Sequence, residues 1–205
     1  MPMALFAKDS GEQVFWKWFQ RHEPKIYQFE KNQESVLDEI SAQLAKYKEG
    51  LVFEISKEHD GKREFIISGD GLKELFPAVE ALKSSAPKLA RWSIVAFRPR
   101  MEAYERFSLT YGGKEFDPGK LWTYHRIQDG YFDLIIYHPD YLEEERNAFV
   151  SGAYILLDMA MGEYDVVTGI RYIDHKKTPD DPRSEGLRPF AELRATFDEY
   201  KARNR

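Results

Sequence analysis

Apolar residues recur with a helical period near the start of the chain and with a strand period after it. Residues 11–49 carry two amphipathic stretches, and residues 31–33 separate them. After Gly50, short apolar runs alternate with turn residues, which is typical of strands. The apolar positions that predict the two helices are Phe15, Trp18, Phe19, Val36, Leu37, Ile40 and Leu44.

The strand region contains two segments of similar sequence. Residues 59–68 read HDGKREFIIS, and residues 128–137 read QDGYFDLIIY. An Asp-Gly pair between two apolar runs is a strong signal for a β-hairpin. In both places a helical pattern and a further apolar run follow, so the sequence predicts an internal duplication of one ββαβ unit.

These patterns predict an α+β fold in which tandem ββαβ units form a mainly antiparallel sheet, with helices at both ends of the chain. We expect a single domain over residues 1–205. Its parts are a helical extension (11–49), the first ββαβ unit (51–100), a connector (101–119), the second ββαβ unit (120–174), and a linker with a docking helix (175–205).

The helices and strands of the two units have specific expected limits. A first helix is expected near Asp70, with Pro77 kinking it or marking a later start. A second helix is expected over residues 141–161, with the capping-box spacing of Asp140 and Glu143. The run at 164–173 predicts the strand that closes the second unit.

Counting outward from each Asp-Gly turn predicts which residues face each other across the hairpins. Basic and acidic residues pair in both units, Lys57 with Glu64 and Arg126 with Asp133. The same count pairs Ile55 with Ile66, Phe53 with Ser68, Tyr124 with Ile135, and Trp122 with Tyr137.

One face of the predicted sheet therefore carries a mixture of aromatic and polar residues. Its large side chains are Phe53, Trp122, Tyr124 and Tyr137, while Phe65, Phe132 and the other apolar residues lie on the opposite face, where helices should pack. The aromatic face is a candidate ligand-binding surface, with Arg98 as an anion contact. The alternative is that the aromatic helix FWKWF covers this face and completes the core.

Composition and charge narrow the classes of function. Thirty basic and 35 acidic residues give a net charge of -5, spread evenly along the chain, which argues against nucleic-acid binding. The absence of cysteine excludes disulfides and thiolate metal sites. The first residues do not resemble a signal peptide, and no apolar run is long enough to span a membrane, so we expect a cytoplasmic protein.

Recognisable catalytic, metal and cofactor motifs are missing from the sequence. The five histidines show no ligand spacing, and the segment SGDG at 68–71 lacks the remaining residues of a phosphate-binding loop. We expect no metal and no cofactor. The most unusual segment, LLDMAMGEYD, places Asp158, Glu163 and Asp165 around a helix end, where acids oppose the helix dipole.

Those three carboxylates can be interpreted in three ways: as catalytic groups, as members of a structural network, or as ligand-binding groups. Buried carboxylates with shifted pKa values can act as general acids or bases. Alternatively, Arg98, Arg100 or Arg171 on neighbouring strands pair with them in a structural network.

The segments FWKWF, LVFEI, FIISGDG, APKL, AFRPR and LLDMAMGEYD together resemble a family of uncharacterised bacterial proteins. The resemblance covers residues 15 to about 173 and implies a bacterial source but no activity or functional residue. More distantly, the two strand-helix units resemble the effector-binding fold of gyrase-inhibitor-like and haem-binding SOUL proteins. That fold lacks the long helical segment with which this chain begins.

Three functional hypotheses follow. The favoured one is a non-catalytic binding module that uses the aromatic face for a small molecule or a protein partner. The second is a hydrolase or isomerase that uses Asp158, Glu163 and Asp165. The third is a protein-interaction or immunity-type factor, with homodimerisation as one form of it.

Overall fold

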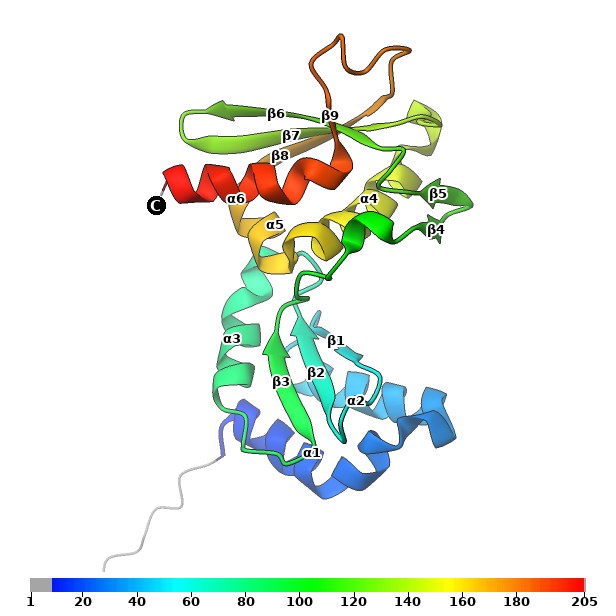
Figure 1. The fold of residues 1–205 in the computed structure, drawn as a ribbon. Helices are drawn as coiled ribbons and strands as arrows, with labels where there is room; N and C mark the ends of the chain where they lie inside the picture. Colours follow the sequence, from blue (N-terminus) through cyan, green and yellow to red (C-terminus); the bar gives the residue numbers. More distant parts are fainter. Residues whose placement is uncertain (1–8, 205) are drawn as a thin grey trace, which may run out of the picture. The chain divides into compact units, whose positions relative to one another are not determined.

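The computed structural model describes residues 9–204 and has an α+β fold with mainly antiparallel sheets and helices at both ends (Figure 1). The chain divides into two compact units, one ending at Phe97 and the other beginning at Arg98. The sequence predicts one domain over residues 1–205 with a helical extension at residues 11–49. In the structure, the helical segment packs within the first unit.

Two helices joined by a short 3-10 turn begin the first unit. Ser10 starts the first helix with a capping box, because its hydroxyl accepts the Gln13 backbone N–H while the Gln13 side chain accepts the Ser10 N–H. The helices meet at the predicted position. They are α1 (Gly11–Tyr27), η1 (Phe29–Asn32) and α2 (Gln33–Tyr47).

The sheet of the first unit has the strand order β1-β2-β3, with β1 antiparallel and β3 parallel to β2. Its helix starts later than Asp70, and Pro77 occupies the first turn, where a missing backbone N–H costs nothing. The elements are β1 (Val52–Ile55), β2 (Arg63–Ser68), η2 (Lys73–Leu75), α3 (Phe76–Ser84) and β3 (Trp92–Ala96).

The aromatic residues of α1 fill the core of this unit. The Phe65 ring lies 5.1 Å from Phe19 and 6.3 Å from Trp16, measured between ring centroids. The Trp16 indole also donates a hydrogen bond of 2.8 Å to the carbonyl of Leu82 in α3. Helices α1 and α3 therefore cover the same face of the sheet, the one that carries Phe65.

The register of the first hairpin differs from the prediction by one residue. His59 and Lys62 bridge as counted, but Ile55 pairs with Phe65 rather than Ile66. One extra residue lies in the strand before the turn, and the Ser56 hydroxyl accepts the backbone N–H of Glu64 at 2.8 Å. Such a bulge moves every residue beyond it to the other face.

The predicted pairs of Lys57 with Glu64 and of Phe53 with Ser68 are therefore wrong. Lys57 lies outside the strand, and Phe53 pairs with Ile67. The Phe53 ring stacks on Phe65 at 5.5 Å. Phe53 thus belongs to the covered face of the first unit.

The second unit repeats the strand-strand-helix-strand order with additions. Its sheet has the order β8-β7-β6-β9, with β6 antiparallel and β8 parallel to β7. The strands are β6 (Trp122–Gln128), β7 (Tyr131–His138), β8 (Ile170–Lys177) and β9 (Arg188–Pro189). The other elements are η3 (Tyr104–Arg106), β4 (Leu109–Tyr111), β5 (Lys114–Phe116), η4 (Glu143–Glu145), α4 (Arg146–Met161), α5 (Glu163–Gly169), η5 (Phe190–Glu192) and α6 (Leu193–Arg203).

The two units share one topology and one kind of turn. Asp60 and Gly61 both have positive φ, as do Asp129 and Gly130, which is the geometry of tight hairpin turns. A shared topology is what a duplication would leave. Common origin of the two units stays a prediction.

Two expectations for the second unit are wrong. Helix α4 begins at Arg146 after a 3-10 turn, and no described side chain caps it, so Asp140 and Glu143 form no capping box. The segment expected to be a strand from residue 164 is helix α5 up to Gly169. Gly162, with φ of 80°, ends α4 and lets the chain start a new helix.

The core of the second unit lies on one face of its sheet. Phe132, Leu134 and Ile136 of β7 are at most 2% exposed and pack under α4 and α6. The Phe197 ring of α6 lies edge-on to Phe132 at 5.3 Å. This arrangement confirms the prediction that helices pack on the more apolar face.

Among residues 9–204, no helix combines the length and apolar character needed to span a membrane.

Candidate functional site

The face of the second sheet opposite α4 and α6 carries three of the predicted site residues. Strand register places Trp122 beside Tyr137, and Tyr124 beside Ile135, as predicted. The parallel strand β8 extends both rows, adding Lys176 next to Tyr137 and Asp174 next to Ile135. We call these residues, together with Tyr172, the open face: Trp122, Tyr124, Ile135, Tyr137, Tyr172, Asp174 and Lys176.

The rings of the open face are accessible to different degrees. Tyr124 is 42% exposed and Tyr172 is 55% exposed, whereas Trp122 and Tyr137 are partly buried. Burial is the main cause of the raised pKa of the Tyr137 phenol, and the charge of Glu185 adds to it. Tyr137 thus offers a phenol that stays protonated, as a hydrogen-bond donor, at neutral pH.

The loop between β8 and β9 borders the open face at its Trp122 end. The guanidinium of Arg183 lies over the Trp122 ring, 5.8 Å from the centroid. The charge of Glu185, on the same loop, contributes to the raised pKa of Tyr137. Figure 1 shows this loop rising on the side of the sheet away from α6.

The turn end of this sheet face holds a buried carboxylate between two arginines. The predicted pair of Arg126 with Asp133 is present at 3.4 Å. Arg171 makes the stronger contact, with hydrogen bonds of 2.9 and 2.6 Å to the two oxygens of Asp133. The bond from Arg171 is the main reason that the pKa of Asp133 lies below its usual value.

The other two predicted ligand-binding residues lie elsewhere. Phe53 packs in the core of the first unit against Phe65. Arg98 belongs to the second unit, but its guanidinium contacts Asp158 of α4 at 3.5 Å, and α4 packs on the covered face of the sheet. The structure therefore brings together Trp122, Tyr124 and Tyr137, and it does not add Arg98 to them.

The carboxylates considered for catalysis are paired with cations or backbone donors. Glu163 is fully buried and accepts the backbone N–H of Arg98 at 3.1 Å. Asp165 binds Arg100 at 2.8 Å and Lys201 at 2.6 Å. Arg100 also binds Asp198, and this contact is the main cause of the lowered pKa of the Asp198 carboxyl.

Helix α5 changes the electrostatic interpretation of these acids. Glu163 and Asp165 lie in its first turn, where the helix dipole favours negative charge, rather than at the end of α4. Their charges are thus stabilised by both the dipole and their partners. This geometry favours the structural network over a general acid or base.

Two histidines of the second unit, the buried His138 and the half-buried His125, have structural surroundings. His138 accepts the Asp140 backbone N–H on Nδ1, so its Nε2 carries the proton that is donated to the Glu115 carbonyl at 2.8 Å. His125 stacks on Phe132 at 5.1 Å, and burial lowers its pKa. Within residues 9–204, no group of three or more His, Asp or Glu side chains is placed to hold a metal ion.

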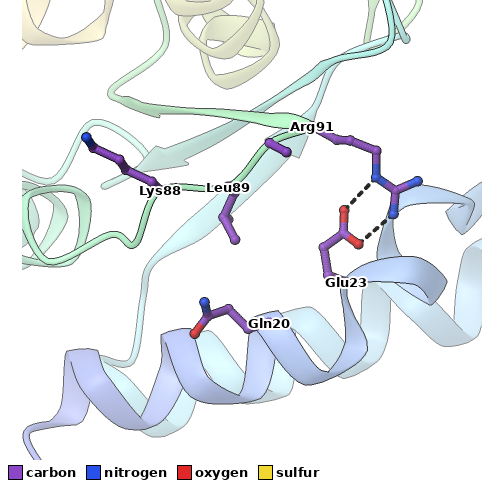
Figure 2. Close-up of a pocket in the computed structure, with 6 residues that line it drawn as sticks. Gln20, Glu23, Lys88, Leu89 and Arg91 are labelled. Carbon is purple, nitrogen blue, oxygen red and sulfur yellow. Dashed lines mark hydrogen bonds and ion pairs between the residues drawn. The ribbon is translucent and has the colours of Figure 1, made fainter.

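The first unit contains a shallow hollow of about 260 Å³ between α1 and the segment before β3 (Figure 2). Two of the charged side chains that line the hollow, Glu23 and Arg91, bind each other. Glu23 accepts two hydrogen bonds from Arg91 and one of 2.9 Å from the Trp92 indole. Figure 2 shows Lys88 extending away from that pair. The residues that line the hollow are Gln20, Glu23, Lys88, Leu89, Ala90 and Arg91.

Sequence reasoning missed Tyr172, Asp174 and Lys176 of the open face and Arg183 of the loop beside it. The strand that carries Tyr172 and Lys176 was expected to end at residue 173, whereas β8 continues to Lys177. The alternation of residues 170–177 was the available signal. Arg183 comes from a loop, whose position relative to Trp122 has no signal in the sequence.

No protein-family model matches this chain, and neither the curated proteins nor the solved structures contain a significant match to it. The family resemblance drawn from the sequence therefore stays a prediction. The geometry of the open face and of the carboxylate network is the basis for the functional proposal.

Proposed function

We propose that this protein is a non-catalytic binding module that uses the open face of its second sheet. The observation that carries the proposal is the set of aromatic side chains left accessible on a sheet whose other face packs against α4 and α6. Tyr124 and Tyr172 are exposed, and Trp122 and Tyr137 lie between them and the β8–β9 loop.

Physical chemistry supports a contact role for such a face. An antiparallel sheet can leave one face to water, and polar side chains would suffice for that purpose. Tyrosine and tryptophan instead provide a large apolar area with few rotatable bonds and a polar end, which suits them to recognition. Clustered exposed aromatic residues are therefore better explained by a ligand or partner than by stability.

The carboxylate cluster supports the non-catalytic part of the proposal. Asp158 and Asp165 both have arginine partners, and Glu163 is fully buried with a backbone donor. A general acid or base needs access to its substrate and a proton that it can exchange. The proposal also includes a cytoplasmic location, which follows from the sequence analysis.

The proposal can be tested by native mass spectrometry of untagged protein purified gently from its own host. We expect an adduct above the mass of the 24.1 kDa chain, or a complex with a partner protein, in the parent. Trp122→Ala should lose it, because the largest ring of the face is gone. Tyr111→Ala is the matched control, since Tyr111 is 41% exposed but lies on β4.

Circular dichroism of both variants separates loss of binding from loss of fold. If Trp122→Ala stays folded and retains the adduct or partner as fully as the parent, the open face is not the binding site. The same conclusion follows if Tyr111→Ala and Trp122→Ala lose it equally.

A further inference from the structure

The negative charges on the open face are neutralised within the fold. Asp174 pairs with Arg146 at 3.1 Å, and Asp133, at the turn end, is held by Arg171 and Arg126. These carboxylates are therefore poor partners for an incoming cation. The face differs in this respect from the chain as a whole, whose net charge is -5.

Two cations near the same rings make no ion pair of 4.0 Å or less with a carboxylate among the described residues, although the charge of Lys176 contributes to the lowered pKa of Asp174. Lys176 is exposed and adjoins Tyr137 in the strand register. Arg183 is exposed and contacts the Trp122 ring through its guanidinium alone. Glu185, on the same loop, is the nearby negative charge, and its influence falls on Tyr137.

The two rings and Lys176 lie in one row across the strands, and Arg183 lies over one of the rings. Trp122 and Tyr137 are direct neighbours across β6 and β7, so their side chains are about 5 Å apart at the Cβ atoms. Lys176 lies beyond Tyr137 on β8, and Arg183 lies over Trp122. The pair of adjacent rings thus has one cation beside it in the sheet, Lys176, and one over a ring face, Arg183.

We propose that this row binds a planar aromatic small molecule that carries an anionic group, either a phosphate or a carboxylate. The ligand ring packs on Trp122 and Tyr137, and its anion contacts Arg183 or Lys176. The inference rests on the proposed function, because it names the ligand class of the same face.

Other occupants fit the charges less well. A neutral aromatic molecule would leave both cations without a partner, and a cationic one would be repelled by them. A second copy of the chain would bring the same two cations against each other. A long polyanion would extend beyond the face over a chain whose net charge is negative.

The test uses the full chain labelled with ¹⁵N and two matched pairs of probes. Adenosine monophosphate is compared with adenosine, and 2-naphthoate with 2-naphthamide. The indole N–H signals report on the four tryptophans, and the signal missing from Trp122→Phe identifies Trp122. We expect each anionic probe to shift the Trp122 signal and to bind about fivefold more tightly than its neutral partner, as exposed ion pairs of up to about 1 kcal/mol allow.

The double variant Lys176→Gln/Arg183→Gln should lose this preference for the anionic probe. Lys177→Gln is the matched control, because Lys177 is exposed on the same strand but alternates to the other face. Of the two anionic probes, the one that shifts the Trp122 signal more shows whether phosphate or carboxylate is the preferred group.

Equal binding of the charged and neutral probes, or an unchanged Trp122 signal with all four, overturns the inference. The proposed function fails separately. An adduct or partner that depends on Trp122, combined with no preference for anionic probes, would keep the binding module and reject its ligand class.

Discussion

The two faces of the second sheet are made by the same strands, but one face is buried in the core and the other is partly exposed. On the covered face, Phe132, Leu134 and Ile136 are almost fully buried under α4 and α6. On the open face, the neighbouring positions of the same hairpin carry Tyr124 and Tyr137. Because side chains alternate along a strand, one stretch of sequence can supply both a core and a contact surface.

The largest expected contrast between the faces is in stability. Phe132→Ala removes a fully buried ring that touches Phe197 and Tyr200, and it should lower the free energy of unfolding by about 3–5 kcal/mol. Tyr172→Ala, on the exposed side, should change it by less than about 0.5 kcal/mol. Urea unfolding followed by circular dichroism measures both, and equal losses would show that the open face is also a packed one.

The covered face should also be the more sensitive to acid, through His175. This imidazole lies beside Ile136 and is 5% exposed, and its Nε2 has no hydrogen-bond partner within the described structure. Burial lowers its pKa from 6.5 to about 4, the charge of Arg146 adds to the effect, and Asp174 opposes it. The folded protein therefore holds His175 neutral.

The sign of the pH dependence follows from that lowered pKa. Keeping His175 neutral contributes its full share to the free energy of unfolding above about pH 6.5. As the pH falls towards 4, the unfolded chain gains a proton on this residue before the folded protein does, and about 3 kcal/mol of stability is lost. His175→Leu should lose about 2 kcal/mol less than the parent between about pH 7 and about pH 4.5 in urea unfolding. His59→Gln, at an exposed position, is the control. Identical losses in parent and His175→Leu would refute the assignment.

A smaller effect is expected where α4 meets the connector hairpin. A Cβ atom on Gly152 would lie 2.2 Å from ring carbons of Phe116, which is 1% exposed. Gly152→Ala should therefore destabilise by about 1–2 kcal/mol, even though alanine favours helices by about 1 kcal/mol over glycine. Thermal unfolding measures the loss, with Ser151→Ala as the control on the same helix.

Shortening the ring provides a sharper version of that prediction. In a Phe116→Leu background, Gly152→Ala should cost less, because the atoms it meets have been removed. An undiminished cost would mean that the helix itself, rather than its contact with Phe116, excludes a side chain.

The smallest effects are expected among the charges of the open side. Arg171 binds both oxygens of Asp133, whereas Arg126 makes one contact of 3.4 Å and is 60% exposed at its side chain. Arg171→Gln should lower the urea midpoint more than Arg126→Gln, which should leave it nearly unchanged. The reverse order would show that Arg126 is the main partner of Asp133.

Comparing the two hairpins shows how far the sequence predicts strand register. Counting from Asp129-Gly130 gave the pairs of Trp122 with Tyr137 and of Arg126 with Asp133, and both are present. The same count from Asp60-Gly61 failed beyond the turn, because a bulge at residues 56–58 adds one residue. A bulge is stabilised by local hydrogen bonds, such as that of Ser56 with Glu64, and the apolar pattern does not encode it.

The candidate site was predicted in part for the same reason. Trp122, Tyr124 and Tyr137 lie on one regular hairpin, where alternation alone puts them on one face. The count from Asp60-Gly61 placed Phe53 on the corresponding face of the first unit, and the bulge turned it towards Phe65. Arg98 was selected for its charge, and the packing of α4 and α5 decided that it pairs with Asp158 and Glu163.

The sequence by itself determined the α+β class, the repeated ββαβ order, the hairpin turns and the aromatic side of the second hairpin. Each of these follows from local rules, namely the period of apolar residues and the preference of Asp-Gly for positive φ. Only the tertiary structure decided the bulge in the first hairpin, the extra helix α5 before β8 and the position of Arg183 over Trp122. The bulge depends on a hydrogen bond across the hairpin, and the other two features depend on contacts between residues far apart in the chain, such as Asp165 with Arg100 and Arg183 with Trp122. In all three, tertiary contacts outweigh local preference.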